Sequence, residues 1–98
     1  MSIDYSYRFE LLKNVAEGLV FSELEAQLDA QPGEFCRCDD CVMDMAAIAL
    51  NSIKPMYRYS LLGELYAVQA THEKVYADSV EQAVAAAIAK VRANPSHQ

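Results

Sequence analysis

All three cysteines of the 98-residue chain lie within six residues, in the segment Cys36-Arg37-Cys38-Asp39-Asp40-Cys41. A CxCxxC spacing brings three sulfur ligands within reach of one metal ion, and zinc in proteins takes four soft or borderline ligands in a tetrahedron. We expect Cys41 to begin a helix, where exposed backbone N–H groups and the helix dipole favour the thiolate that binds metal. The segment therefore predicts three of the four ligands of a zinc ion, Cys36, Cys38 and Cys41.

Three reduced cysteines in a core, or a disulfide, are the alternatives to a metal site. A disulfide leaves one of the three cysteines unpaired. The first residues, Met1-Ser2-Ile3-Asp4, contain neither the basic segment nor the apolar core of an export signal. We therefore expect a reduced, cytoplasmic protein whose thiols are available to a metal.

Size and composition limit both the fold and the class of partner. We expect one small domain over residues 1–98, whose core gains stability from bound metal or from a second copy. Hydrophobic residues make up 53% of the sequence, which predicts exposed apolar surface on a monomer and hence a homodimer. A net charge of −6 argues against direct nucleic-acid binding, because basic surfaces supply most of the affinity for phosphate backbones. No apolar run approaches the roughly 18 residues of a membrane span, so we expect no membrane partner.

Hydrophobic periodicity predicts a first helix over about residues 7–30. Apolar residues recur there at steps of four: Leu12, Ala16, Val20, Leu24 and Leu28. Gly18 lies inside this helix and indicates either a close contact with another helix or a bend. Gln31-Pro32-Gly33-Glu34 ends the helix and leads into the cysteine segment.

A second helix follows the cysteines, with Asp39 or Asp40 as its cap and an end between Asn51 and Pro55. Its apolar positions repeat at helical spacing: Val42, Met45, Ala46, Ala49, Leu50 and Ile53. Tyr57-Arg58-Tyr59-Ser60 alternates weakly and predicts a short extended link.

The remaining sequence predicts two further helices. Five apolar residues indicate the third: Leu61, Leu62, Leu65, Val68 and Tyr76. The fourth begins at Asp78-Ser79-Val80-Glu81, which resembles a capping box, and ends at Asn94-Pro95. Its apolar positions are Val80, Val84, Ala87, Ile88 and Val91. The expected fold is therefore all-α, a small domain of about four helices with a zinc-bound CxCxxC loop.

Three stretches of the sequence together resemble one known family. They are Cys36-x-Cys38-x-x-Cys41-x-x-Asp44, the stretch from Ala49-Leu50-Asn51 to Pro55-x-Tyr57, and the ending Asn94-Pro95-Ser96-His97. They are similar to the late competence ComFB family of bacterial regulatory proteins, and the similarity covers most of the chain. The sequence departs from the family pattern at Lys54, where a second proline is frequent.

The resemblance implies an all-helical domain that dimerises, carries zinc on the cysteine loop and acts as a non-enzymatic regulator. It also implies a signalling role, because some members of the family are associated with binding cyclic di-GMP. For the fourth zinc ligand, His97 fits the family ending and gives a Cys₃His set, which is common in structural sites. A frayed terminus is the alternative reading of His97. Three kinds of candidate therefore stay open: His97, His72, or an aspartate among Asp39, Asp40 and Asp44.

The segment Lys54-Pro55-Met56-Tyr57-Arg58-Tyr59 is where cations and aromatic rings interleave. A receptor for cyclic di-GMP would use Arg58 on phosphate or a guanine edge, Lys54 as a point charge, and Tyr57 or Tyr59 for stacking. The alternative is that the tyrosines pack a helix junction and the cations are solvated.

Two other classes of function are alternatives to a receptor. The first is a zinc-stabilised adaptor that binds a regulatory protein in competence, pilus or motility regulation. The second is a zinc enzyme, with Glu34 as a general-base candidate. A catalytic zinc needs an open coordination position and a base in a pocket. No nucleophile–base pair or glycine-rich loop in the sequence supports a reaction, so we expect a protein that is not an enzyme.

Overall fold

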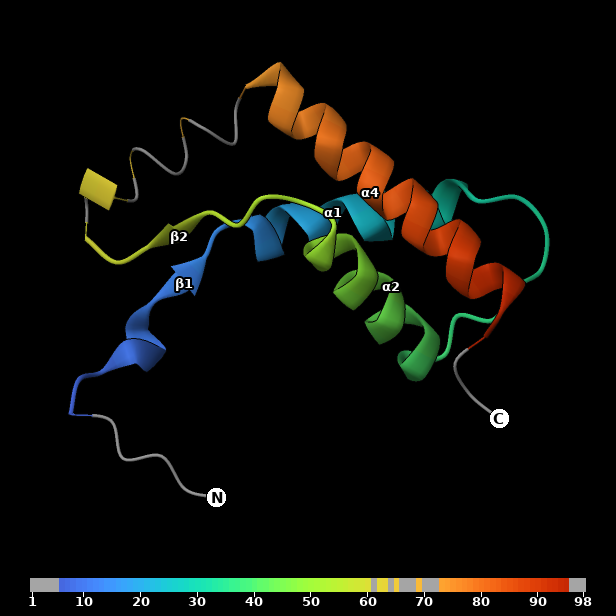
Figure 1. The fold of residues 1–98 in the computed structure, drawn as a ribbon. Coiled ribbons are helices and arrows are strands. Elements are labelled where there is room, and N and C mark those ends of the chain that lie inside the picture. Colours follow the sequence, from blue (N-terminus) through green and yellow to red (C-terminus); the bar gives the residue numbers. More distant parts are fainter. Residues whose placement is uncertain (1–5, 61, 64, 66–68, 70–72, 96–98) are drawn as a thin grey trace.

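A computed structural model describes residues 6–60, 62–63, 65, 69 and 73–95 of the chain. Within them, three α-helices pack around a shared core: α1 (Ala16–Ala30), α2 (Asp39–Asn51) and α4 (Lys74–Ala93). A 3-10 helix, η1 (Phe9–Leu11), and two antiparallel strands, β1 (Lys13–Asn14) and β2 (Tyr57–Arg58), extend from one end of these helices (Figure 1). None of the helices in the described part of the chain has the length and apolar character required to cross a membrane.

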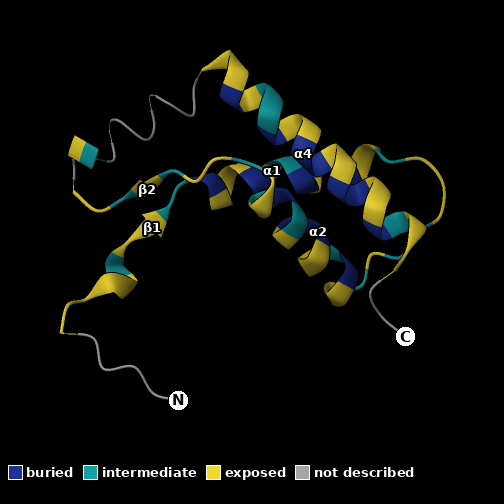
Figure 2. Cartoon of the chain, in the orientation of Figure 1, coloured by how far each residue is buried: buried dark blue, intermediate teal, exposed yellow. Residues whose placement is uncertain are grey.

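The core forms where the apolar faces of the three helices meet (Figure 2). On α1 the predicted step of four is confirmed from its first residue onward, at Ala16, Val20, Leu24 and Leu28. The buried positions of the other two helices include most of those predicted: Met45, Ala46, Ala49, Val80, Val84, Ala87, Ile88 and Val91. The prediction of a mostly helical small domain is confirmed.

The first helix begins later than the sequence indicated. Residues 7–15 hold η1 and β1 instead of helix, and Leu12 is 46% exposed. Lys13 and Asn14 pair with β2 instead. The side-chain oxygen of Asn14 also accepts a hydrogen bond from the backbone N–H of Ala16 at 3.2 Å, which satisfies a donor at the helix start. The close helix contact expected at Gly18 is also wrong, because a Cβ there would meet nothing within 4 Å.

The fourth helix begins earlier than predicted, at Lys74, so the expected capping box at residues 78–81 lies inside α4. The hydroxyl of Ser79 donates to the Tyr76 carbonyl at 2.6 Å, a bond within the helix. Tyr76 itself belongs to α4, where its ring is buried in the core. The rest of the expected third helix lies largely outside the described residues, although Leu62, Gly63, Leu65 and Gln69 have helical backbone.

The two short strands correct the all-α expectation. The extended link expected at residues 57–60 is confirmed at Tyr57–Arg58, but it pairs with a strand that the sequence did not indicate. The register sets Lys13 opposite Arg58 and Asn14 opposite Tyr57. We call the segments 6–14 and 56–60 the arm. The Cα radius of gyration is 15.5 Å, above the roughly 13 Å of a compact domain of this size.

Candidate functional site

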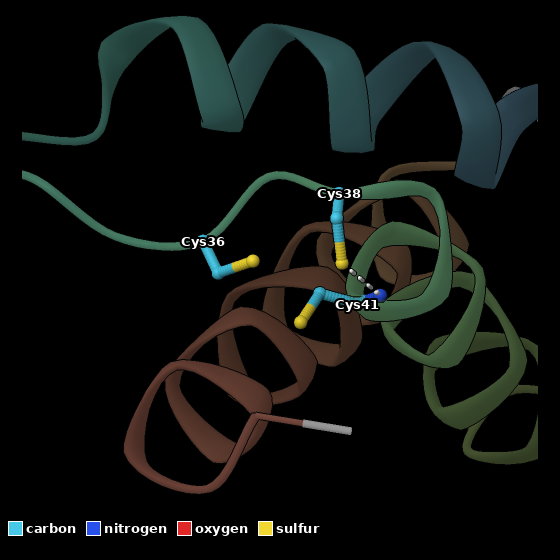
Figure 3. Close-up of side chains that lie close together, drawn as sticks. All are labelled: Cys36, Cys38 and Cys41. Atoms are coloured by element: carbon cyan, nitrogen blue, oxygen red, sulfur yellow. Dashed lines mark hydrogen bonds between the residues drawn. The ribbon is translucent and has the colours of Figure 1, made fainter. Parts of the chain in front are cut away.

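The three thiols converge at the start of α2 (Figure 3). Cys36 lies in the preceding loop, Cys38 is the N-cap residue of α2, and Cys41 is buried in its first turn. All three sulfur atoms lie within 4.8 Å of one another. Sulfurs that share one tetrahedral zinc are about 3.8 Å apart, as follows from a Zn–S bond of about 2.3 Å. A small contraction of the loop would therefore bring three thiolates onto one ion, and the donor set fits zinc.

Cys38 provides the cap that the sequence analysis assigned to Asp39 or Asp40. The helix begins at Asp39, ahead of the expected start at Cys41, and the backbone N–H of Cys41 donates to the Cys38 sulfur at 3.5 Å. A thiolate is the better acceptor for this bond and is also favoured at a helix N-terminus. The cysteine loop is thus joined directly to the start of the helix.

Cys38 and Cys36 differ in acidity. The pKa of Cys38 is lowered, first by the backbone N–H of Cys41 and then by the hydrogen bond with the Cys36 side chain. For Cys36 a backbone hydrogen bond involving Cys38 acts to lower the pKa. That effect is outweighed by hydrogen bonds with the other two thiols, by burial and by the charge on Cys38, so the pKa of Cys36 is raised. Cys38 therefore ionises before Cys36.

Arginine–aromatic contacts hold the cysteine loop against α4. The guanidinium of Arg92 lies 4.6 Å from the centre of the Phe35 ring, and that of Arg37 lies 5.8 Å from it. Arg37 also pairs with Asp29 of α1 at 3.2 Å. Gly33 turns the loop with φ of 82°, and a Cβ there would lie 3.1 Å from Arg92. Neither Phe35 nor Arg92 was expected from the sequence, because their contact joins segments far apart in the chain.

The candidates for the fourth ligand divide into two groups. His97 and His72 lie outside the described residues. Asp39, Asp40 and Asp44 are exposed, and within the described part of the chain no carboxylate joins the three thiols as a possible ligand.

The four residues expected to bind a nucleotide follow α2 and occupy different surroundings. Lys54 is exposed beside Met56 and Tyr76, and its carbonyl accepts a hydrogen bond from the Tyr76 hydroxyl at 2.8 Å. Tyr57 and Tyr59 are 61% and 68% exposed, so neither ring packs a helix junction. Arg58 is half-buried on β2.

Arg58 and Lys54 line different hollows. Arg58 is also separated from Tyr57, because successive strand residues point to opposite faces. Arg58 lines an open hollow with Lys13 of β1 and Phe21 of α1, two residues that the sequence analysis did not single out. Lys13 could be found only from its cross-strand position opposite Arg58. The sequence does not show that position, because it does not show which strands pair.

Comparison with known proteins agrees with the fold. The family model of the late competence development protein ComFB matches residues 13–95. A solved structure of the late competence protein ComFB from Bacillus subtilis superimposes with a TM-score of 0.70 and 25% sequence identity, over 87% of this chain and 92% of that one. Among curated proteins, no match to the chain was found. Because the family model spans most of the sequence, the chain belongs to the late competence development protein ComFB family.

Proposed function

We propose that the protein is a zinc-stabilised, non-enzymatic regulator that binds cyclic di-GMP in the cytoplasm. The observation that carries the proposal is that one short segment at β2 brings together a half-buried arginine, Arg58, and two exposed rings, Tyr57 and Tyr59. Arginine suits both phosphate and a guanine edge, and exposed aromatic rings stack on bases. In a chain of net charge −6, an anionic ligand requires such a local concentration of cations and rings.

Zinc in this proposal holds the loop that begins α2. Cys36, Cys38 and Cys41 supply three ligands, and His97 supplies the fourth. Arg92 contacts the loop through Phe35. His97 follows Arg92 by five residues, a span of up to about 17 Å for an extended chain. In this proposal, that span carries His97 to the thiols without any change in α4.

The protein acts as a homodimer in this proposal. The arm exposes several large apolar side chains outside the helical core: Tyr7, Phe9, Leu12, Tyr57 and Tyr59. A second copy would cover such a surface. A two-fold dimer also matches a ligand that has two-fold symmetry. Sedimentation at micromolar concentration tests the dimer, and a clean monomer would rule it out.

Calorimetric titration of the zinc-loaded protein with cyclic di-GMP tests the receptor function. Cyclic di-AMP serves as the comparison ligand. We expect saturable binding of cyclic di-GMP, weakened by Arg58→Ala by on the order of 2–3 kcal/mol, or roughly 30- to 150-fold. Lys90→Ala, which removes an exposed cation from α4, is the matched control and should bind as the parent does. Zinc content and helicity should be unchanged in both variants.

The second candidate function is a protein-interaction adaptor in competence, pilus or motility regulation. It is favoured by an apolar hollow of about 370 Å³ between α1 and α2. Phe21 and Met43 at its rim are 44% and 68% exposed. A parent protein that binds no cyclic dinucleotide, but that binds a regulatory protein and loses this binding with Met43→Asp, would favour the adaptor.

A further inference from the structure

The hollow that Arg58 lines is formed by the strand pair and the first two turns of α1. Its volume is about 460 Å³, within the usual range for small-molecule sites. Seven residues line it: Lys13, Asn14, Val15, Glu17, Gly18, Phe21 and Arg58. They combine two cations, a carboxylate, an aromatic ring and a glycine in one place.

The two cations lie on the same face of the strand pair. Lys13 is directly opposite Arg58 in the register, and residues opposite each other have Cβ atoms about 4.5–5.5 Å apart. The two side chains together offer an anion positive charge and several N–H donors, and a phosphate would accept hydrogen bonds from both.

The α1 side of the hollow suits a flat base. Phe21 is 44% exposed and lies one helical turn after Glu17. Between them, Gly18 leaves the helix surface open, since a Cβ there would meet nothing within 4 Å. A purine lying over Gly18 could stack on Phe21. The carboxylate of Glu17 could accept hydrogen bonds from the N1–H and amino group of guanine, whereas adenine presents an acceptor at N1.

We propose that this hollow is the subsite for one guanosine phosphate half of cyclic di-GMP. Lys13 and Arg58 bind the phosphate, Phe21 stacks on the base, and Glu17 selects guanine. The inference rests on the proposed receptor function and deepens it. It makes Lys13, and not Lys54, the partner of Arg58, because Lys54 lines a separate hollow with Tyr76 and Val75.

Calorimetry on the zinc-loaded full chain, with cyclic di-GMP and cyclic di-AMP as probes, tests the subsite. Lys13→Ala should weaken cyclic di-GMP binding about tenfold or more, as expected for a charge-assisted contact, whereas Lys54→Ala should bind as the parent does. Glu17→Gln should reduce the preference for cyclic di-GMP over cyclic di-AMP. Melting curves and circular dichroism confirm that each variant is folded.

Phe21 also borders the apolar hollow between α1 and α2, so its test needs two variants. Phe21→Tyr keeps an aromatic face and should bind nearly as the parent does. Phe21→Leu keeps apolar packing but removes stacking, and should weaken binding by roughly 5- to 150-fold. Equal affinities of the two variants would remove Phe21 from the subsite.

The possible failures of the subsite and of the receptor function are distinguishable. If the parent binds cyclic di-GMP, and Arg58→Ala and Lys54→Ala weaken binding while Lys13→Ala and Glu17→Gln do not, the subsite is overturned and the receptor stands. If the parent binds 5′-GMP but not cyclic di-GMP, and Lys13→Ala removes that binding, the receptor is overturned and a guanine site remains. Binding of neither nucleotide overturns both.

Discussion

Asn14 and Met56, 42 residues apart in the sequence, are joined by a 2.8 Å hydrogen bond from the backbone N–H of Met56 to the side-chain oxygen of Asn14. The same oxygen accepts from Ala16 at 3.2 Å. Beside it, the backbone N–H of Val15 donates to the Met56 carbonyl at 2.6 Å. One side chain therefore joins the start of α1 to the strand pair and sets where the arm leaves the helical core.

Asn14→Ala should destabilise the protein, because two backbone donors lose their acceptor at once. We expect a loss of about 1–2 kcal/mol in the free energy of unfolding, measured by urea denaturation. Asn14→Asp keeps the acceptor oxygen and should recover most of that stability. A stability of Asn14→Ala equal to the parent would show that the cap and the Met56 bond are not needed.

Removing zinc should loosen or unfold the domain, because metal bound to a site absent from the unfolded chain contributes folding free energy. We expect one zinc per chain after purification under reducing conditions without added metal, measured by elemental analysis. Chelation should lower the melting temperature, and Cys41→Ser should do the same in the parent's buffer. A protein purified without any bound transition metal would exclude the site.

In the metal-free protein, Cys38 should react with iodoacetamide before Cys36 at neutral pH. The reason is that the pKa of Cys38 is lowered, first by the Cys41 N–H, and that of Cys36 is raised. The thiolate is the reactive form. Peptide mass spectrometry after brief labelling measures the order, and zinc-loaded protein is the control, in which both thiols should be protected. Faster labelling of Cys36 would reverse the assignment.

Tyr76 should make stability fall in strong alkali. Burial raises the pKa of its phenol above the usual value, so the folded state favours the protonated form. The corresponding stabilisation is complete below the unfolded pKa of about 10 and is lost as pH rises through the folded pKa.

Tyr76→Phe tests this behaviour. At pH 7 it should lose about 1 kcal/mol, because the 2.8 Å bond to the Lys54 carbonyl disappears. Between pH 9 and about 11, its melting temperature should fall less than the parent's. Tyr59→Phe, at an exposed ring, is the matched control. The Lys74–Asp78 pair also titrates in alkali, because hydrogen bonding to Asp78 raises the lysine pKa. The pair is present in the parent and in both variants, so its contribution to the pH dependence cancels in the comparison. Parallel curves of melting temperature against pH for the parent and Tyr76→Phe would contradict the prediction.

Two glycines should respond to alanine in opposite directions. Gly18→Ala should stabilise α1 by about 0.5–1 kcal/mol, because its Cβ meets nothing and alanine favours helix. Gly33→Ala should destabilise the protein by about 1–2 kcal/mol, because φ is 82° there, a backbone conformation that residues with a Cβ adopt only at a cost. Urea denaturation of the two variants measures both effects. Changes of the same sign would contradict this account.

Much of the helical core and the cysteine loop could be predicted because both depend on short-range patterns. Ala16, Val20, Leu24 and Leu28 repeat at the helical period, so their shared buried face follows from the chain itself. Likewise, a spacing of one and two residues between Cys36, Cys38 and Cys41 nearly ensures that the thiols lie close together.

The errors occurred where a distant segment decides the local structure. The periodic pattern continued back through Leu12, but β1 forms there because Lys13 and Asn14 pair with residues more than 40 positions away. At α4, Tyr76 is helical and buried because its ring packs in the core and its hydroxyl reaches the Lys54 carbonyl.

The sequence by itself therefore determined the family resemblance, the thiol cluster and the buried helix faces, because these are set by spacing along the chain. Only the tertiary structure decided that Lys13 lies opposite Arg58 and that Arg92 contacts Phe35. Strand register and interhelical contacts depend on the packing of remote segments, and no local pattern of residues specifies which distant partner each one meets.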